Sequence, residues 1–276
     1  MRVAPAVVFV RLMTLVVAAL VAKPSLAQSQ PPQAVNRQVD RLSVSSLLLE
    51  VVSGGQQLGT ATGFVVQKGN KFYLVTNWHV VTCLRPDNGT SLDPQRRTPD
   101  EIKIFHNTKG KLGEWHWVSE SLTDSATGKP RWIEHPALGK RVDIIALPLT
   151  KTSDIDLYPI DLNLRNVPIR LLPAGAVSIV GFPFGHASYL GLPIWKAGTV
   201  ASDPDFDYDG LPEVLVDATG RPGMSGSPVF ARRSGGYLDD EGNITVSPSV
   251  TDRFMGYMQE ILMTGVKWGV YGSPLR

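Results

Sequence analysis

The sequence contains a single cysteine among its 276 residues, so no intrachain disulfide can form. Cys83 is therefore predicted to be a small buried apolar residue. The sequence also shows no internal repeat, no metal-ligand cluster, no G-x-G-x-x-G and no phosphate-binding loop. These absences exclude a domain stapled by disulfides and give no sign of a nucleotide or metal site.

The apolar run at the N-terminus is short. Residues 12–22 form an eleven-residue core between Arg11 and Lys23. As a helix it would rise about 16 Å, too little for a membrane core of about 30 Å. Ser25-Leu26-Ala27 has small residues at the positions that a signal peptidase reads, so residues 1–27 are predicted to be a signal peptide and the protein to be secreted or periplasmic. An uncleaved anchor ranks second because it would have to bury Arg11.

A strong excess of either charge is also missing. The 27 basic and 25 acidic residues give a net charge of +2, and removal of residues 1–27 takes away three basic residues and no acids, which leaves −1. A nearly neutral chain has no electrostatic reason to bind nucleic acid. The mature protein is expected to have no stable membrane span, and its oligomeric state is left open.

The composition is that of a globular chain rich in turns, with 43% hydrophobic residues, 26 glycines and 21 prolines. Short apolar runs separated by Gly and Pro favour an all-β architecture over long helices. Residues 28–41 are predicted to be a flexible leader, followed by subdomains at 42–155 and 156–276. Strands are predicted at 47–52, 60–66, 71–75, 101–106, 114–118, 143–149, 167–172, 176–181, 194–200, 213–217, 227–231, 254–261 and 265–271.

One serine stands in a setting suited to a nucleophile. Ser225 lies between Gly223 and Gly226, after a Pro-Gly turn and before an apolar strand. A serine nucleophile must project from a tight turn whose backbone N–H groups face the developing oxyanion, and glycines allow both the bend and the close approach of substrate. On its own, this Gly-Ser segment could equally be an ordinary turn.

A histidine and an aspartate upstream complete a reactive set. His79 ends an extended apolar segment, and Asp143 opens an apolar run in which a carboxylate needs a hydrogen-bonding partner. The Nδ1–H of His79 would be that partner. Taken singly, His79 could be a structural histidine and Asp143 could end a strand. In the chain order His, Asp, Ser, the three residues predict a nucleophilic triad.

These segments resemble the bacterial trypsin-like serine peptidases, in the branch of the Deg-type proteases and glutamyl endopeptidases. Residues 76–80 resemble their T-N-x-H-V segment, residues 142–147 their D-[IL]-A-x-[LI] strand, and residues 217–226 the Deg-type D-A-x-x-x-P-G-N-S-G. Residues 225–230 are closer to the glutamyl endopeptidases. The matches span about residues 45–270 and imply a member without a PDZ domain.

The resemblance implies two antiparallel six-stranded β-barrels of the chymotrypsin type with the active site between them. It further implies a serine endopeptidase acting on proteins or peptides without a metal or organic cofactor. Ser225 would attack the scissile carbonyl, His79 would carry the proton, Asp143 would orient His79, and the N–H groups of Gly223 and Ser225 would form the oxyanion hole. The alternative is a catalytically silent barrel that serves as a binding or scaffolding module.

The same resemblance implies a substrate pocket with Thr219 as its floor, Gln259 and Glu260 in one wall and Gly269 at the back. Thr219 carries no charge, and the wall strand lacks the histidine of glutamyl-specific relatives. Cleavage is therefore predicted after small or medium uncharged residues, not after Arg, Lys or Glu. Met224 stands where trypsin-like zymogens carry an aspartate. It is predicted to pack from behind against the turn that carries Ser225, the serine turn.

Overall fold

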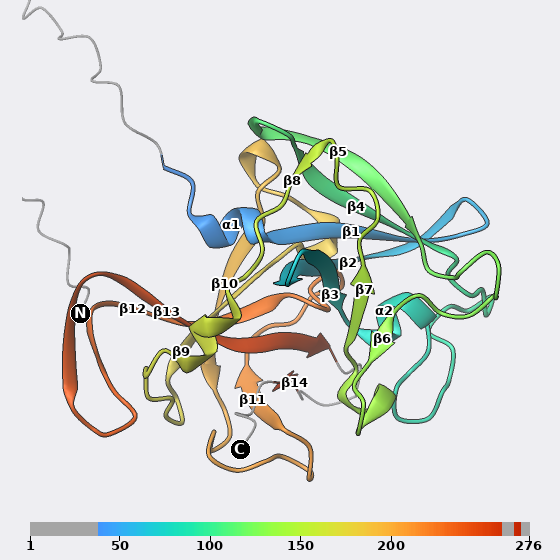
Figure 1. The fold of residues 1–276 in the computed structure, drawn as a ribbon. Helices are drawn as coiled ribbons and strands as arrows, with labels where there is room; N and C mark the ends of the chain where they lie inside the picture. Colours follow the sequence, from blue (N-terminus) through green and yellow to red (C-terminus); the bar gives the residue numbers. More distant parts are fainter. Residues whose placement is uncertain (1–37, 261–267, 272–276) are drawn as a thin grey trace, which may run out of the picture. The chain divides into compact units, whose positions relative to one another are not determined.

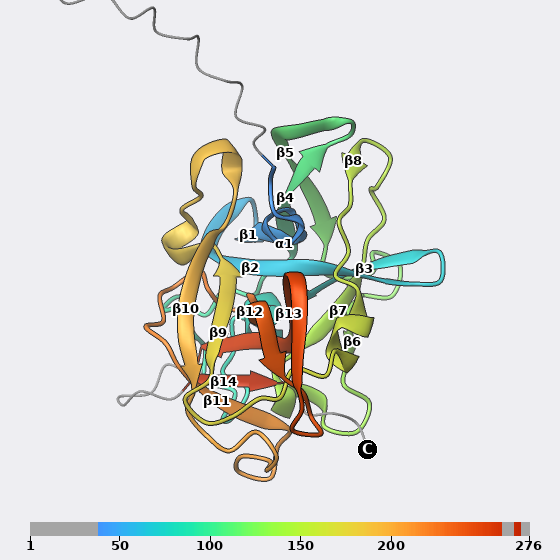
Figure 2. The same cartoon turned by 90° about the vertical axis from the view of Figure 1, so that its left-hand side faces the viewer.

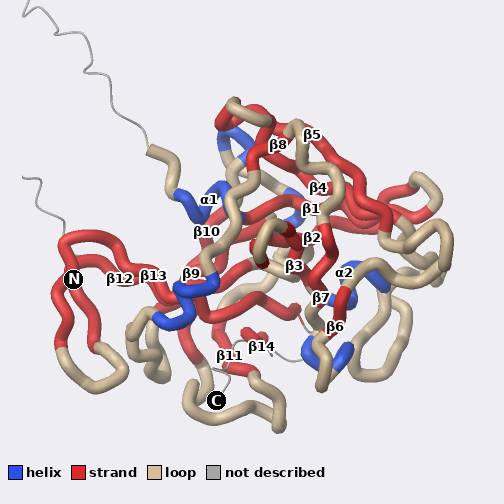
Figure 3. Tube along the Cα trace, viewed as in Figure 1, coloured by secondary structure: helices blue, strands red, loops and turns tan. Residues whose placement is uncertain are grey.

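The computed structural model describes residues 38–260 and 268–271, of which all but Gln38 belong to the compact unit that begins at Val39. Strands are its main regular structure, and helices are confined to short segments (Figures 1 and 3). The elements are α1 Arg41–Ser45, β1 Ser46–Ser53, β2 Gln56–Lys68, β3 Lys71–Thr76, α2 Trp78–Thr82, β4 Glu101–Thr108, β5 Lys111–Ser121, β6 Ile133–Glu134, η1 Gly139–Val142, β7 Ile145–Pro148, β8 Ile155–Asp156, η2 Leu162–Asn166, β9 Ala176–Gly181, η3 Pro183–Gly185, η4 Tyr189–Gly191, β10 Ile194–Val200, β11 Glu213–Asp217, β12 Pro228–Leu238, β13 Ile244–Glu260 and β14 Trp268–Tyr271.

The first half of the chain forms an antiparallel sheet in the order β5-β4-β1-β2-β3-β7-β6, with β8 paired to β4. Six of its strands have four to thirteen residues, while β6 and β8 contain two residues each. Beyond β5 and β6 the two ends of the sheet meet, because the N–H of Arg131 donates to the carbonyl of Leu122 at 3.0 Å. We call this unit the first barrel.

The second half forms a closed barrel in the order β10-β11-β14-β13-β12-β9, seen in yellow to red in Figure 2. All its strand pairs are antiparallel. Its core is apolar and includes Ile179, Val229, Met255 and Met258. We call this unit the second barrel.

A separate apolar cluster joins the two barrels. Phe64 of β2 lies 5.6 Å from Phe254 of β13 in an edge-to-face arrangement, and Phe230 of β12 lies 5.5 Å from the same ring. β1 is buried along almost its whole length, so its side chains do not alternate between core and solvent. Ser46 of β1 shows why: its hydroxyl donates to the carbonyl of Val180 in β9.

The predicted all-β fold of the chymotrypsin type is confirmed, with two antiparallel sheets of which the second is a closed six-stranded barrel. The first sheet has eight strands and not the six predicted, because the short strands β6 and β8 add to it. The strands predicted at 176–181, 194–200 and 213–217 have the observed bounds. The strand predicted at 167–172 is wrong, since Ile169 forms an isolated bridge there and Pro168 has no N–H to donate to a ladder. The strand predicted at 254–261 is part of the much longer β13, and residue 261 lies outside the described residues.

Several predictions concern parts of the chain that the structure describes incompletely. The signal peptide 1–27 and leader residues 28–37 lie outside the described residues, as do residues 265–267 of the last predicted strand. Arg41, placed at the end of the leader, begins α1. The subdomain boundary placed after residue 155 falls inside β8. In the described part of the chain, no helix combines the length and the apolar character that a membrane crossing requires.

Candidate active site

His79 is positioned by the end of β3 and a single turn of helix. β3 ends at Thr76, Asn77 caps the N-terminus of α2, and His79 is the second residue of that helix. The helix ends at Thr82, and its C-cap Cys83 is left-handed (φ 53°) and donates its N–H to the carbonyl of His79. The imidazole is 13% exposed. The backbone of His79 is therefore fixed by the helix and its cap, while its ring remains open toward the junction of the barrels.

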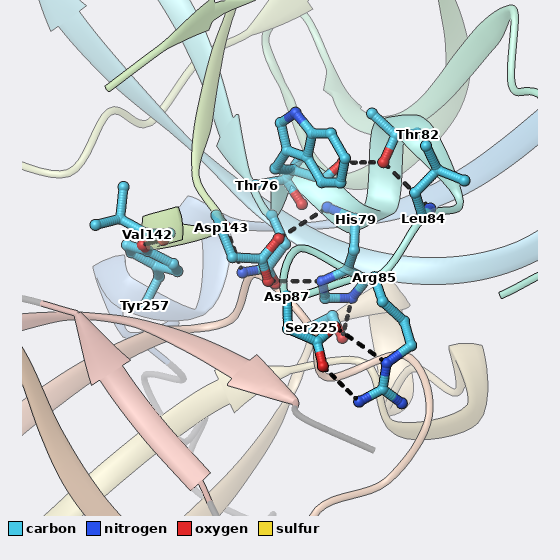
Figure 4. A network of polar contacts seen from close by, with 12 residues as sticks. Thr76, His79, Thr82, Leu84, Arg85, Asp87, Val142, Asp143, Ser225 and Tyr257 are labelled. Atoms are coloured by element: carbon cyan, nitrogen blue, oxygen red, sulfur yellow. Dashed lines mark hydrogen bonds and ion pairs between the residues drawn. The ribbon is translucent and has the colours of Figure 1, made fainter. Parts of the chain in front are cut away.

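Asp143 lies directly opposite His79 and is fully buried (Figure 4). Its Oδ2 lies 2.7 Å from Nδ1 of His79, and its Oδ1 accepts the backbone N–H of the same histidine at 2.8 Å. The carbonyl of Asp143 accepts the side-chain amide of Asn77 and the backbone N–H of Trp78. These contacts offset the cost of burying the carboxylate and orient the ring and backbone of His79 together.

Asp143 adopts the left-handed conformation, with φ 46°, at the end of the short helix η1. Aspartate tolerates this region better than most residues because its short polar side chain bonds locally. The preceding carbonyl, that of Val142, accepts the hydroxyl of Tyr257 from the second barrel. Burial, with the nearby carboxylates of Asp143 and Glu213, raises the pKa of Tyr257 well above its ordinary value, so this hydroxyl remains a donor.

Ser225 comes from the second barrel, in the turn between β11 and β12. Its Oγ lies 3.0 Å from Nε2 of His79, which completes a line of contacts from Asp143 through His79 to the serine (Figure 4). The preceding residue, Met224, is completely buried in the core of the second barrel. The structure thus brings together the three residues that the sequence singled out, from segments 64 and 146 residues away from His79.

The turn before Ser225 leaves two backbone donors available. The N–H groups of Met224, Gly226 and Ser227 donate to protein carbonyls. Within the described residues, the structure shows no protein acceptor for the N–H of Gly223 or of Ser225. Gly223 adopts φ +94°, and a Cβ there would lie 2.4 Å from the carbonyl oxygen of Phe182. Glycine is required at this position, and the two donors predicted for an oxyanion are unoccupied.

A cavity of about 240 Å³ lies beside Ser225. Apart from Ser225, its walls come from the first half of the chain and are mostly apolar. The lining residues from that half are Val51, Leu58, Gly59, Thr60, Ala61, His79, Val80, Cys83, Leu92, Asp93 and Pro94. Burial, followed by the nearby carboxylate of Asp93, raises the pKa of the Cys83 thiol to about 11. Cys83 is therefore protonated at neutral pH and forms part of an apolar wall instead of acting as a nucleophile.

The residues predicted to bind substrate occupy different environments. Thr219 is exposed, and its carbonyl accepts the ammonium of Lys196 from β10. Gln259 is buried, and its Oε1 has no hydrogen-bond partner among the described residues. Its backbone pairs with that of Gly269, whereas the side chain of Glu260 lies outside the described residues. The substrate-binding role of all four residues remains a prediction.

Several supporting residues were missed at the level of sequence. Asn77 holds the backbone of Asp143, Lys196 reaches Thr219, and Thr62 contacts the serine turn. A signal for Asn77 existed in the segment around His79, and one for Thr62 in the Gly-rich run at 59–63. Neither pattern shows which polar atom meets which partner. No cluster of three or more His, Cys, Asp or Glu suited to a metal occurs among the residues that the structure describes.

Two antiparallel barrels with an Asp-His-Ser line at their junction define the class of the trypsin-like peptidase fold. Residues 61–237 match the family model of the trypsin-like peptidase domain, and the chain belongs to that family. A comparison with curated proteins gave no match.

Two solved structures are similar to this chain. One is a serine endoprotease from Yersinia pestis, with a TM-score of 0.45 and 14% identity, covering 84% of this chain and 60% of the other. The second is the protease of tobacco vein mottling virus, with a TM-score of 0.43 and 13% identity, covering 87% of this chain and 83% of the other. This chain thus spans less than two thirds of the Yersinia pestis chain.

Proposed function

We propose that this protein is an exported serine endopeptidase whose catalytic triad is His79, Asp143 and Ser225. The observation that carries the proposal is the unbroken line of contacts at 2.7 Å and 3.0 Å that joins the buried carboxylate, the imidazole and the serine hydroxyl. Membership in a peptidase family supports a protein or peptide substrate. The segments around His79 and Ser225 favour the Deg-type and glutamyl endopeptidase branch within that family.

The geometry suits acyl transfer in two steps. Ser225 Oγ attacks the scissile carbonyl carbon while Nε2 of His79 accepts the hydroxyl proton, and Asp143 stabilises the imidazolium that results. The C–N bond then breaks, and Nε2 returns the proton to the leaving amine. Water, deprotonated by the same nitrogen, hydrolyses the ester and regenerates Ser225.

The two open N–H groups of Gly223 and Ser225 support a role in binding the negative oxygen of the tetrahedral intermediate. The leaving side of the substrate would then lie against the apolar cavity beside His79 and Ser225. The substrate segment before the scissile bond would contact the second barrel, near Thr219 and Gln259. No step in this sequence requires a metal or organic cofactor.

Export belongs to the same proposal and rests on the apolar core and small residues of positions 1–27. N-terminal sequencing of exported protein should begin at Gln28. A mature protein that retains the first 27 residues would favour an anchored form instead.

The test of the enzyme itself is active-site labelling. A fluorophosphonate probe should label the wild-type protein at Ser225, and Ser225→Ala should abolish the label while the thermal unfolding midpoint stays close to that of the wild type. A folded wild-type protein that neither takes the label nor degrades casein would refute the proposal. That result would favour the binding or scaffolding module.

A further inference from the structure

Thr62 of β2 lies where three segments of the candidate active site meet. It is fully buried, and its backbone N–H donates to the carbonyl of Ser225 at 2.9 Å. Its hydroxyl donates to the carbonyl of Gly223 at 2.7 Å and accepts the N–H of Phe182 at 3.0 Å. One residue of the first barrel thus contacts the serine turn on both sides of Met224.

The serine turn, residues 222–227, is a series of peptide planes. Most of these planes are fixed by hydrogen bonds that do not involve Thr62. The N–H of Phe184 donates to the carbonyl of Pro222 at 2.5 Å, and the N–H of Ser227 donates to that of Met224 at 3.0 Å. These two contacts fix the planes that carry the N–H groups of Gly223 and Ser225, because a peptide group is rigid and planar. What they leave open is how the two planes are turned relative to each other.

The plane between them, which joins Gly223 to Met224, sets that relation. Its N–H donates to the carbonyl of Arg221 at 3.1 Å, and its carbonyl accepts the hydroxyl of Thr62. Gly223 at φ +94° has no side chain to resist rotation, so this plane depends on hydrogen bonds for its orientation. Rotation of the plane would change the distance between the two proposed oxyanion donors.

We propose that the hydroxyl of Thr62 is a positioning group for the oxyanion hole. It holds the N–H groups of Gly223 and Ser225 at the spacing that a tetrahedral oxygen requires. This inference rests on the proposed function of Ser225. Thr62 is not a catalytic residue, since its hydroxyl bonds to the carbonyl of Gly223 and the N–H of Phe182 and not to the hydroxyl of Ser225.

The chemistry of the position calls for a hydroxyl. A hydroxyl both donates and accepts, and Thr62 uses both capacities in a buried site. Valine has the same shape but would leave the carbonyl of Gly223 and the N–H of Phe182 without partners. There is little room for rearrangement, because a Cβ on the neighbouring Gly181 would lie 2.9 Å from the hydroxyl oxygen.

Thr62 also links the turn to the segment that carries His79. Its carbonyl accepts the hydroxyl of Thr76 at 2.9 Å, and Thr76 is the last residue of β3, three positions before His79. The barrel that supplies the base therefore also sets the oxyanion turn of the other barrel. An ordered oxyanion hole therefore requires that the two barrels are correctly docked.

The experiment compares Thr62→Val, Thr62→Ser and Thr62→Ala with a matched control, Ser46→Ala. Ser46 is fully buried and its hydroxyl also donates across the barrels, to the carbonyl of Val180 at 3.0 Å and not to a residue of the serine turn. Steady-state hydrolysis of p-nitrophenyl acetate gives kcat and KM, expressed per site titrated with a fluorophosphonate. Thermal unfolding measures the stability lost in each variant.

We expect Thr62→Val to lower kcat about 10- to 100-fold, since small misplacements of catalytic groups cost up to about 100-fold, with KM changed less than about twofold. Thr62→Ser should remain within about threefold of wild type, and Ser46→Ala within about twofold despite a similar loss of Tm. The pH midpoint of kcat/KM should be unchanged in Thr62→Val, because the contacts of His79 are intact.

Two results would overturn the inference. One is a kcat in Thr62→Val within twofold of wild type, and the other is an equal loss of kcat in Ser46→Ala at equal stability. If Thr62→Val fails to fold, the comparison passes to Thr62→Ser and Thr62→Ala, which differ by the hydroxyl alone. An equal kcat per titrated site in these two variants would then refute the inference. A wild-type protein that takes no label would instead refute the proposed function itself.

Discussion

The two sides of the active site are held together in different ways. On the His79 side, the contacts are local to the first barrel, where residues 77–79 bond to Asp143 through side chain and backbone alike. On the Ser225 side, the turn depends on neighbours distant in sequence, with Thr62 of the first barrel contacting Gly223 and Ser225. His79 and Asp143 are thus fixed mainly within the first barrel, with one contact from Tyr257 of the second barrel to Val142, whereas the position of Ser225 depends on the docking of the barrels.

Both barrels have apolar core clusters, but they differ in the ionisable side chains that they bury. Among the described residues, those buried in the first barrel include His106, Glu120 and Asp143, and those buried in the second include Glu213 and Tyr257. The only histidine among these five is in the first barrel, so acid should act on the two barrels differently.

The largest effect is expected from loss of the nucleophile. Ser225→Ala should lower turnover by on the order of 10⁶, and His79→Ala by a similar amount, because members of a triad act as a unit. Casein hydrolysis and fluorophosphonate labelling measure the loss. Circular dichroism and thermal unfolding should show a native fold in both variants. Turnover by Ser225→Ala at the wild-type rate would disprove the assignment of the nucleophile.

A smaller loss is expected when only the orienting carboxylate is changed. Asp143→Asn keeps the shape of the side chain but can present an N–H to the imidazole, which favours the wrong tautomer, so kcat should fall by about 10⁴. Asp143 makes its other contacts through Oδ1 and its carbonyl, so the fold should persist.

The control is Asp87→Asn, which removes an exposed ion pair with Arg85 and should leave kcat within about twofold. A kcat for Asp143→Asn close to that of the wild type would show that the carboxylate of Asp143 is not what orients His79.

Acid should weaken the first barrel through His106. Burial, reinforced by His116 and opposed by Glu120, lowers the pKa of His106 to about 4, below the ordinary 6.5. Below pH 6.5, His106 binds a proton in the unfolded chain but stays neutral in the folded protein. The free energy of unfolding therefore falls as the pH is lowered from 6.5 to about 4. The loss amounts to about 3 kcal/mol when complete.

Urea denaturation at several pH values measures this effect. His106→Gln should remove most of the slope between pH 6.5 and 4, while His186→Gln, at an exposed position, serves as the control. An unchanged slope in His106→Gln would show that acid acts elsewhere in the molecule.

These contrasts also explain what the sequence could reveal. His79, Asp143 and Ser225 each stand beside a strand with a clear apolar pattern, so each was located by its local setting. The bond between Thr62 and Gly223 joins positions 161 residues apart and depends on how two finished barrels dock. No local pattern contains that information, and the role of Thr62 became visible only in the assembled structure.

The β12–β13 hairpin shows the opposite limit. Its outer part was not predicted because the strands there leave large apolar residues such as Ile244 and Val246 exposed, at 82% and 78%. A strand with no buried face lacks the alternation by which strands are recognised. Its ladder of backbone hydrogen bonds forms without that signal.

The smallest expected effect concerns the choice of substrate. Lys196 places its ammonium on the carbonyl of Thr219, the predicted pocket floor, so a positive charge already stands where an Arg or Lys side chain would enter. Peptides with Ala or Val before the scissile bond should show a kcat/KM at least about tenfold above those with Arg or Lys. A cleavage profile from a peptide library measures this.

Lys196→Gln sharpens the test, because it should narrow the discrimination against Arg and Lys while leaving cleavage after Ala within about twofold. A wild-type profile dominated by Arg or Lys would contradict the prediction and implicate Asp217 or Glu260 as the group that attracts a base. An unchanged preference in Lys196→Gln would instead assign the discrimination to the shape of the pocket. In either case the groups that select the substrate would lie on the second barrel, whereas the base, His79, would lie on the first.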